Sequence, residues 1–328
     1  MARSARLLLT AAAAIGAMLA ALIEAAQAQT YPNRPIRFVV SNPPGGASDL
    51  IVRIIGPPLG ERLGQNIIVD HRPGANGNIS AEVVAKSAPD GYTLLYANNS
   101  LLVVNPHIYS KSTVDVMKDL VPVATSITNQ LVLAANPKIV PSNDLAGFIE
   151  QARQAKGSLF YASIGNGSQH HLAMEMLKQM AKIDMTHVPY RGGGPASISV
   201  IAGDNAVMFG GASVVQHIKS GKLKGLAVTE KKGWPTMPEL PGIGEVLPGY
   251  RVGLWHVLLA PRGTPQAIVD KLRTELNAVL KIPEVRDRLI STGSGEPYIT
   301  TQQELQALVR TDYDQFGKLV KSIGFKVD

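Results

Sequence analysis

The sequence of 328 residues contains no cysteine, few aromatic residues and an unusually small share of charged residues. The absence of cysteine excludes disulfide bonds, thiolate metal sites and a cysteine nucleophile. Aromatic residues make up 5% of the chain and charged residues 17%, whereas hydrophobic residues reach 45%. This composition argues against a disordered chain and against a coiled coil. The length suits two domains of roughly 150 residues, each with its own core.

The N-terminus has the three parts of a secretory signal peptide. Arg3 and Arg6 precede an apolar run over 7–23, and Ala26-Gln27-Ala28 matches an A-x-A cleavage site. We therefore expect residues 1–28 to be removed and the mature protein to be exported to the bacterial periplasm. No later segment approaches the 18 or so uninterrupted apolar residues expected of a membrane helix.

The chain is mildly basic, and its formal charge falls from +7 to +6 when residues 1–28 are removed. The basic residues are scattered singly, without the dense patch of arginine and aromatic residues that is typical of nucleic-acid binding. We expect no nucleic-acid partner and interpret the positive charge as an attraction for anionic solutes.

Short β-rich runs alternate with helical patterns, which is typical of a parallel α/β architecture. The pattern predicts strands at 36–40, 67–70, 93–97, 131–134, 159–162, 186–189, 206–209, 223–228 and 255–260. It predicts helices at 48–63, 77–87, 144–155, 168–182, 194–202, 265–280, 284–291 and 301–321. Within the first helix, Gly56-Pro57-Pro58 predicts a kink or a break, because proline lacks the amide donor and its ring clashes with the preceding turn.

The order of these elements predicts two similar lobes, with crossings between them near 128–131 and 252–255. The first lobe comprises 29–128 together with 253–328, and the second lobe comprises 129–252. Two crossings make a hinge. A hinge between α/β lobes places a cleft at the carboxyl ends of the strands, where ligands bind in such sheets.

The loop after the first predicted strand has the features of an anion-binding turn. Two prolines and two glycines lead directly into a helix, where free amides and the positive end of the dipole favour an anion. Asp49 and Arg53 are four residues apart and can pair on that helix. The residues of this loop that we predict to bind the ligand are Ser41, Asn42, Gly45, Gly46, Ser48 and Asp49.

A loop of the same kind precedes the helix at 168–182 in the second predicted lobe. Two such loops facing each other across a cleft can hold one carboxylate. The Gly165-x-Gly167 pair lacks the third glycine of a dinucleotide fingerprint, so we expect no nucleotide. The sequence also has no Walker loop and no haem or pyridoxal signature, so we expect no other cofactor. The residues predicted to bind the ligand here are Ser163, Gly165, Asn166, Gly167 and Ser168.

Polar residues near other strand ends extend the predicted site. Asn98 and Asn99 follow the third strand and offer donors and acceptors. Arg191 stands in a glycine-rich loop and can give a charge-assisted hydrogen bond to an anion. A solvated arginine on a turn explains Arg191 equally well.

Signatures of metal binding and of catalysis are weak. His171 and Glu175 are four residues apart, but no third ligand stands at zinc spacing, so we predict no metal. The chain lacks the G-x-S-x-G turn of serine hydrolases. A hydrolase or isomerase using Ser168 with His170 or His171 stays open as an alternative to a protein without catalytic residues.

Many short motifs follow one another in a fixed order from about Tyr31 to the C-terminus. They include Tyr31-Pro32-Asn33-Arg34-Pro35, Pro44-Gly45-Gly46, Pro89-Asp90-Gly91-Tyr92-Thr93, Tyr161-Ala162-Ser163 and His187-Val188-Pro189-Tyr190. With these motifs the chain resembles the receptors of tripartite tricarboxylate transporters, also called Bug proteins.

The resemblance implies a two-lobed periplasmic binding protein of type II topology, in which each lobe is a mostly parallel sheet flanked by helices. It implies that a small organic carboxylate is gripped between the lobe loops. The ligand would pass to a membrane transporter with one large and one small integral subunit. A ligand sensor that signals to a membrane partner is a further alternative, and we expect a monomer.

Two departures from the family pattern bear on the ligand. Ser41 and Asn42 replace apolar residues, and Ala206 replaces an acid. Loss of that acid predicts that a ligand carrying an ammonium group is disfavoured, because burying an unpaired charge is costly. A hydroxylated or doubly charged carboxylate is expected to bind better than aspartate or glutamate.

Overall fold

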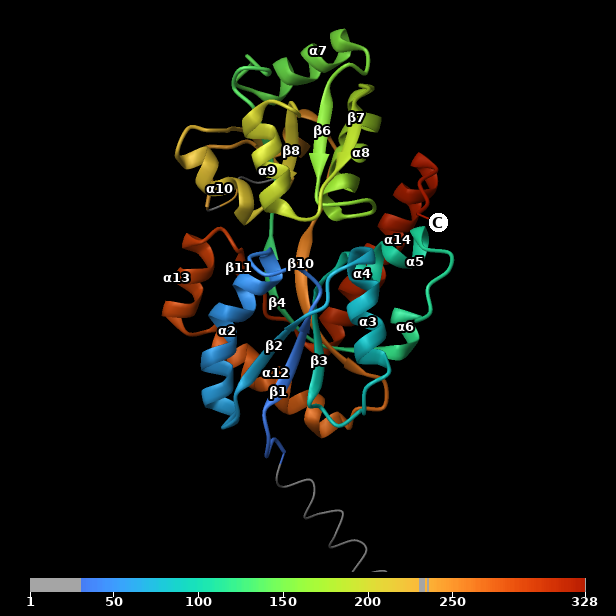
Figure 1. Cartoon of the computed structure of the whole chain (residues 1–328), viewed down its shortest axis with the longest axis vertical. Coiled ribbons are helices and arrows are strands. Elements are labelled where there is room, and N and C mark those ends of the chain that lie inside the picture. Colours follow the sequence, from blue (N-terminus) through green and yellow to red (C-terminus); the bar gives the residue numbers. More distant parts are fainter. Residues whose placement is uncertain (1–30, 230–233, 235, 328) are drawn as a thin grey trace, which may run out of the picture.

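The computed structural model describes residues 31–229, 234 and 236–327. The predicted signal peptide, 1–28, lies outside the described residues. Within them the chain forms two α/β lobes, one above the other in Figure 1, and each lobe is built on one sheet flanked by helices. The predicted α/β fold with two lobes is confirmed.

The sheet of the first lobe has six strands in the order β11-β4-β10-β3-β1-β2. Their bounds are β1 (Ile36–Val40), β2 (Ile67–His71), β3 (Thr93–Asn98), β4 (Leu120–Asn129), β10 (Leu254–Pro261) and β11 (Glu296–Pro297). β1 pairs in parallel with β2 and β3, whereas β10 runs antiparallel to β3 and β4. The carboxyl ends of β1, β2 and β3 therefore share the edge that faces the second lobe (Figure 1).

The sheet of the second lobe has five strands in the order β7-β6-β8-β5-β9. Their bounds are β5 (Val132–Ala135), β6 (Phe160–Ser163), β7 (Thr186–Pro189), β8 (Val207–Gly210) and β9 (Lys224–Val228). This order repeats that of the first lobe: β6 lies between β7 and β8, and the antiparallel strand β5 follows. The loops after β1 and β6 leave the strands where the strand order reverses, which is where ligands bind in such sheets.

Thirteen α-helices and one 3-10 helix, η1, surround the sheets in the described part of the chain. Those of the first lobe are α2 (Ala47–Leu63), η1 (Ala75–Gly77), α3 (Asn78–Ala85), α4 (Ser100–Val103), α5 (Asn105–Ile108), α6 (Val116–Asp119), α12 (Gln266–Leu280), α13 (Pro283–Ser291) and α14 (Gln302–Ile323). Those of the second lobe are α7 (Leu145–Ala155), α8 (Gln169–Ala181), α9 (Gly193–Ala202), α10 (Ala212–Lys219) and α11 (Ile243–Val246). Each predicted helix is present, with ends within two residues of the prediction.

The prediction of a break in the first helix is wrong, because α2 continues through Pro57 and Pro58 over 17 residues. Its apolar face is buried against the first sheet, and Ile51, Ile55 and Leu59 are fully buried. Burying these side chains favours the helix enough to outweigh the loss of two amide donors.

The long strand β4 is absent from the prediction. It carries Pro122, and a proline inside an apolar run argues against a central strand. In the structure Pro122 stands opposite Leu259, at a register shift between β4 and β10 that accommodates the missing donor. After β4, only Gln130 and Leu131 separate the first sheet from β5 of the second, and β10 brings the chain back.

Candidate functional site

A cleft of about 660 Å³ lies between the two lobes. Its lining comes mainly from the loops after β1, β2 and β3 of the first lobe and after β6 and β7 of the second. The lining residues are Ser41, Asn42, Pro43, Pro73, Gly74, Ala75, Asn76, Gly77, Asn98, Tyr109, Ile164, Gly165, Asn166, Tyr190, Arg191, Gly192 and Val327. Two other hollows, along α2 with β2 and beside α5 with α6, are lined by the first lobe alone. The cleft is the candidate site because the strand-order switch points of both sheets open onto it.

Among the described residues, this lining carries its charge on Arg191 and includes no aspartate, glutamate, lysine or histidine. The Arg191 side chain is exposed and has no acidic partner among the residues that the structure describes. Amide side chains of Asn42, Asn76, Asn98 and Asn166 supply neutral hydrogen-bonding groups. An anion with several acceptor atoms suits such a lining, whereas a cation would find no counter-charge on the described residues.

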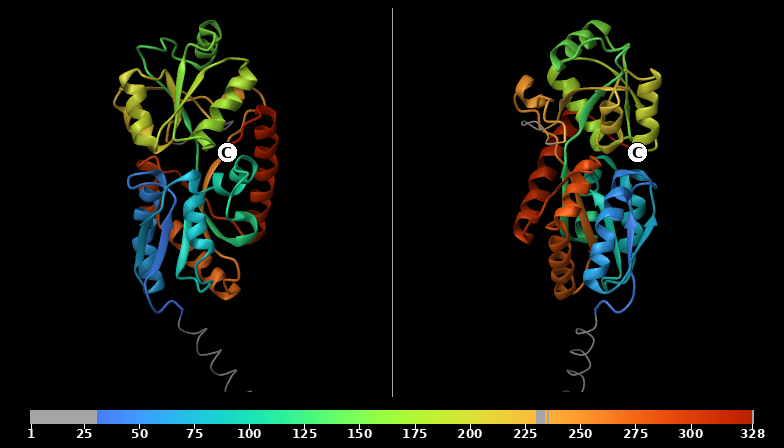
Figure 2. Two further views of the ribbon diagram at one scale, coloured as in Figure 1. Left: turned by 45° about the vertical axis from the view of Figure 1, so that its right-hand side comes forward. Right: turned by 90° about the vertical axis from the view of Figure 1, so that its left-hand side faces the viewer.

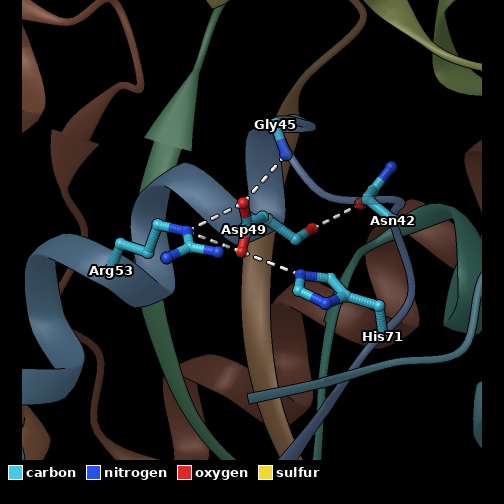
Figure 3. A network of polar contacts seen from close by, with 6 residues as sticks. Asn42, Gly45, Asp49, Arg53 and His71 are labelled. Atoms are coloured by element: carbon cyan, nitrogen blue, oxygen red, sulfur yellow. Dashed lines mark hydrogen bonds and ion pairs between the residues drawn. The ribbon is translucent and has the colours of Figure 1, made fainter.

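The loop after β1 is held from behind by the carboxylate of Asp49, whose side chain is 2% exposed. One oxygen accepts the Gly45 N–H at 2.8 Å, and both accept Arg53 Nε at 3.0 Å. Oδ1 also lies 2.8 Å from Nε2 of His71, the last residue of β2 (Figure 3). Burial alone would raise the pKa of Asp49, but the hydrogen bonds from Gly45, Arg53 and His71 outweigh it and hold the pKa below its usual range. Asp49 is therefore ionised, and its hydrogen bonds hold the turn at Gly45 in place.

The remaining predicted residues of this loop divide between the cleft and the turn. Ser48 Oγ donates to Asn42 Oδ1 at 2.5 Å, and the Gly46 N–H donates to Pro43 O at 3.0 Å. Ser41 and Asn42 line the cleft. The predicted residues outside the lining, with polar groups engaged within the loop, are Gly45, Gly46, Ser48 and Asp49.

The loop after β6 is held by two serine hydroxyls. Ser168 caps α8: its Oγ accepts the His171 N–H at 3.3 Å and donates to Gly165 O at 2.7 Å. Ser163 Oγ accepts the Gly165 N–H at 3.1 Å and lies 2.6 Å from His187 Nε2 on β7. Each lobe thus supports its cleft loop with a histidine from the neighbouring strand. Gly165 and Asn166 line the cleft, and the predicted residues behind it are Ser163, Gly167 and Ser168.

Gly167 is a point of contact between the lobes. Its carbonyl accepts Nδ2 of Asn76 at 3.1 Å. Its φ of +72° lies in the left-handed region, and a Cβ there would stand 2.0 Å from Cδ1 of Ile108 on α5. The close approach of the lobes at this point requires glycine.

The histidines of α8, His170 and His171, are buried in the second lobe, and their contacts are structural. The rings of His171 and His187 stack at 4.1 Å, and His171 Nδ1 accepts the Gly167 N–H at 3.2 Å. Burial lowers the pKa of His170 and of His187 to about 4, and that of His171 to about 3. The Ser168 hydroxyl accepts the backbone N–H of His171, so this geometry gives no support to a Ser168–histidine dyad.

The two asparagines at the carboxyl end of β3, Asn98 within the strand and Asn99 after it, have different surroundings. Asn98 lines the cleft, and its Oδ1 accepts the Ser100 N–H at 3.0 Å. Asn99 is fully buried, and its Nδ2 donates to Gly253 O at 3.1 Å, next to the start of β10. Asn99 therefore ties the end of β3 to the strand that joins the lobes.

Several lining residues were missed by the sequence analysis. Residues 73–77 follow β2 at the same sheet edge, and their glycines and Asn76 resemble the loops that were identified. Tyr109 and Val327 gave no comparable signal, because neither stands after a strand of the sheet edge.

Ala206, whose replacement of an acid was expected to disfavour an ammonium group, lies outside the cleft lining. Ala206 is buried immediately before β8, and its N–H donates to Phe160 O at 2.8 Å. That is the amino end of the strand, and Ala206 is not a lining residue. An acid lost at this position therefore carries no information about the ligand.

The described residues contain no group of three or more metal-ligating side chains that could hold an ion. In the same part of the chain, no helix combines the length and the apolarity needed to cross a membrane.

Comparison with known proteins gives consistent results. The family model described as the tripartite tricarboxylate transporter family receptor (TctC) matches residues 51–325. A UPF0065 protein of Bordetella bronchiseptica is 36% identical over 310 residues, which are 94% of this chain and 91% of that protein. Protein BugT of Bordetella pertussis is 32% identical over 303 residues, which are 92% of each chain.

Two solved structures share the fold and carry dicarboxylates. Rpa4515 of R. palustris with adipate has a TM-score of 0.86 and 32% identity, and covers 90% of this chain and 99% of its own. MatC from Rhodopseudomonas palustris with bound malate has a TM-score of 0.81 and 30% identity, and covers 88% of this chain and 100% of its own. From the family match, the sequence identity and the shared fold, we conclude that the chain belongs to the family of tripartite tricarboxylate transporter receptors.

Proposed function

We propose that the protein is a periplasmic receptor that binds a small organic carboxylate between its lobes and delivers it to a tripartite tricarboxylate-type transporter. The observation that carries this proposal is the charge of the cleft: among the described residues that line it, Arg191 is charged and none is an acid. The similar proteins with adipate and malate support the ligand class.

The proposal extends to the organisation of the molecule. The lobes comprise 29–128 with 253–328 and 129–252, after removal of residues 1–28 as a signal peptide. The receptor acts as a monomer without cofactor or catalysis, and it docks on one large and one small membrane subunit. An assay panel of small esters tests the absence of catalysis, because a receptor shows saturable binding without turnover.

The predicted site residues fall into two roles in this proposal. Residues of the first kind contact the ligand: Ser41, Asn42, Asn98, Gly165, Asn166 and Arg191. Residues of the second kind shape the cleft loops or the hinge: Gly45, Gly46, Ser48, Asp49, Asn99, Ser163, Gly167 and Ser168.

Calorimetry with malate, citrate, adipate, aspartate and glutamate tests the ligand class. We expect at least one of the first three to bind more tightly than both amino acids, since the described part of the lining offers an ammonium group no counter-charge. Tighter binding of aspartate or glutamate would contradict the proposal.

Substituting Arg191→Gln tests the role of the charge. Loss of a charge-assisted hydrogen bond should weaken the best ligand by about 1.5–3 kcal/mol. The matched control is Arg286→Gln, which removes the same charge from an exposed site on α13 outside the cleft lining. Equal affinities of the two variants would exclude Arg191 as a ligand contact.

A further inference from the structure

The last helix and the residues after it connect the two lobes at one side of the cleft. On α14, Asp312 accepts the indole N–H of Trp255 on β10 at 2.7 Å, so the middle of the helix is fixed to the joining strand. Near its end, Ser322 donates to Gln179 of α8 in the second lobe at 3.3 Å. Figure 2 shows α14 running beside the first lobe and up to the second. Gly324 then ends the helix in a left-handed conformation, with a φ of 63°.

The C-terminal tail, defined here as Phe325–Val327, turns from the end of α14 toward the cleft. The ring of Phe325 meets the ring of His171 edge-on at 4.6 Å, which places it against the second lobe. The Val327 N–H donates to Ile108 O at 2.8 Å, and Val327 forms a parallel bridge with Tyr109 of the first lobe. The tail therefore contacts both lobes within three residues.

Val327 and Tyr109 also line the cleft. Their backbones are held together by the bridge, so the position of the Val327 side chain is fixed relative to the first lobe. Val327 adds to the apolar part of the lining, which also includes Ile164 and the rings of Tyr109 and Tyr190, and its bridge with Tyr109 gives this surface a defined place.

We propose that Val327 is a specificity-determining residue that forms a wall of the ligand cleft and limits the length of the bound carboxylate. This inference rests on the proposed function. An apolar wall favours ligands whose methylene chain reaches it without overlap, and it excludes longer ones. Changing the size of this one side chain should thus change the preferred ligand length.

The test uses two variants of the full mature chain, Val327→Ala and Val327→Leu, and three unbranched dicarboxylates, succinate, glutarate and adipate. Both substitutions keep the backbone N–H that bonds Ile108. We expect Val327→Ala to raise the ratio of adipate to succinate affinity by about fourfold or more, the effect of one buried methylene group. Val327→Leu should lower the same ratio by a similar factor.

Control measurements separate this inference from the proposed function. Val246→Ala changes a valine on α11 that is 41% exposed and outside the cleft lining, and should leave the ratio unchanged. If the unmodified protein binds dicarboxylates but neither Val327 variant changes the ratio of adipate to succinate affinity, the proposed role of Val327 is disproved while the proposed function stands. If the unmodified protein binds malate or citrate but none of the three unbranched dicarboxylates, the proposed limit on ligand length is wrong while the proposed function stands. If it binds none of these five acids, the proposed function fails and this inference fails with it.

Discussion

At the scale of single residues, the cleft loops are held by side chains that lie behind the cleft surface rather than on it. Asp49 satisfies a glycine N–H, an arginine and a histidine at once, and Ser163 and Ser168 support the corresponding loop in the second lobe. A loop whose own polar groups are satisfied from behind keeps its shape before ligand arrives, which lowers the ordering cost of binding.

Substituting Asp49→Ala should lower the free energy of unfolding by about 1–3 kcal/mol, because the Gly45 N–H loses its acceptor and a buried charge-assisted network is removed. Because the pKa of Asp49 is lowered in the folded state, this contribution is complete above about pH 4, the unfolded value, and is lost as the pH falls through the folded pKa. Urea unfolding at neutral pH measures the loss. Glu150→Ala, which removes one half of an exposed pair on α7, is the control and should cost less than about 1 kcal/mol.

His170 provides a second prediction at this scale. Its pKa is lowered to about 4 by burial, so in acid the unfolded chain takes up a proton that the folded protein does not. The free energy of unfolding should be highest above about pH 6.5 and fall toward pH 4, by up to about 1.4 kcal/mol per pH unit for each such histidine. Substituting His170→Met should make this decline shallower. Identical slopes in urea unfolding between pH 7 and pH 4 would contradict the assignment.

At the scale of elements, the two sheets repeat one strand order, and each places a loop and a helix start at the cleft. The hydroxyl at the start of α8 both caps the helix and fixes the carbonyl of Gly165. Helix stability and loop shape are therefore coupled in the second lobe.

Substituting Ser168→Ala should lower the free energy of unfolding by about 0.5–2 kcal/mol, as expected for a lost helix cap. It should also weaken ligand binding, because the Gly165 loop loses one support. Thr301→Ala is the matched control: Thr301 caps α14 in an exposed capping box. It should cost similar stability and leave affinity unchanged. Equal ligand affinities of the two variants would show that the Ser168 cap is independent of the site.

At the scale of the whole molecule, binding between the lobes links ligand affinity to their approach. The lobes already touch through Gly167, Asn76 and Ile108, beside the cleft. A ligand that contacts both lobes stabilises their closed arrangement by its difference in affinity between the open and closed states.

Substituting Gly167→Ala should therefore weaken ligand binding by about 1–3 kcal/mol. The new Cβ would collide with Ile108, and the alanine would have to adopt the strained positive φ of this position. Calorimetry measures the affinity, and small-angle scattering should show a larger radius of gyration at saturating ligand than for the unmodified protein. Gly194→Ala is the control, since a Cβ at this helical position meets nothing within 4 Å. Unchanged affinity of Gly167→Ala would disprove the role of this contact.

The local sequence pattern determined the positions of most helices and strands and of the glycine-rich loops. The signals for helices and strands are apolar–polar periodicity, glycines and capping residues, and each involves only a few neighbouring residues. The ends of α2 and α8 and the strand β1 could therefore be predicted from the sequence. The glycine-rich loops after β1 and β6 were likewise visible, because a strand, a flexible turn and a helix start stand next to each other in the chain.

Tertiary structure decided those features that depend on contacts between residues far apart in the sequence. Burial of one face keeps α2 intact through two prolines, and the register shift opposite β10 admits Pro122 into β4. Only the folded chain brings the C-terminal tail to Tyr109, more than 200 residues earlier in the sequence. Likewise, whether a loop amide faces the ligand or an internal acceptor depends on side chains such as Asp49. Local propensity cannot encode such contacts, because their energy arises from groups that meet only after the lobes have formed.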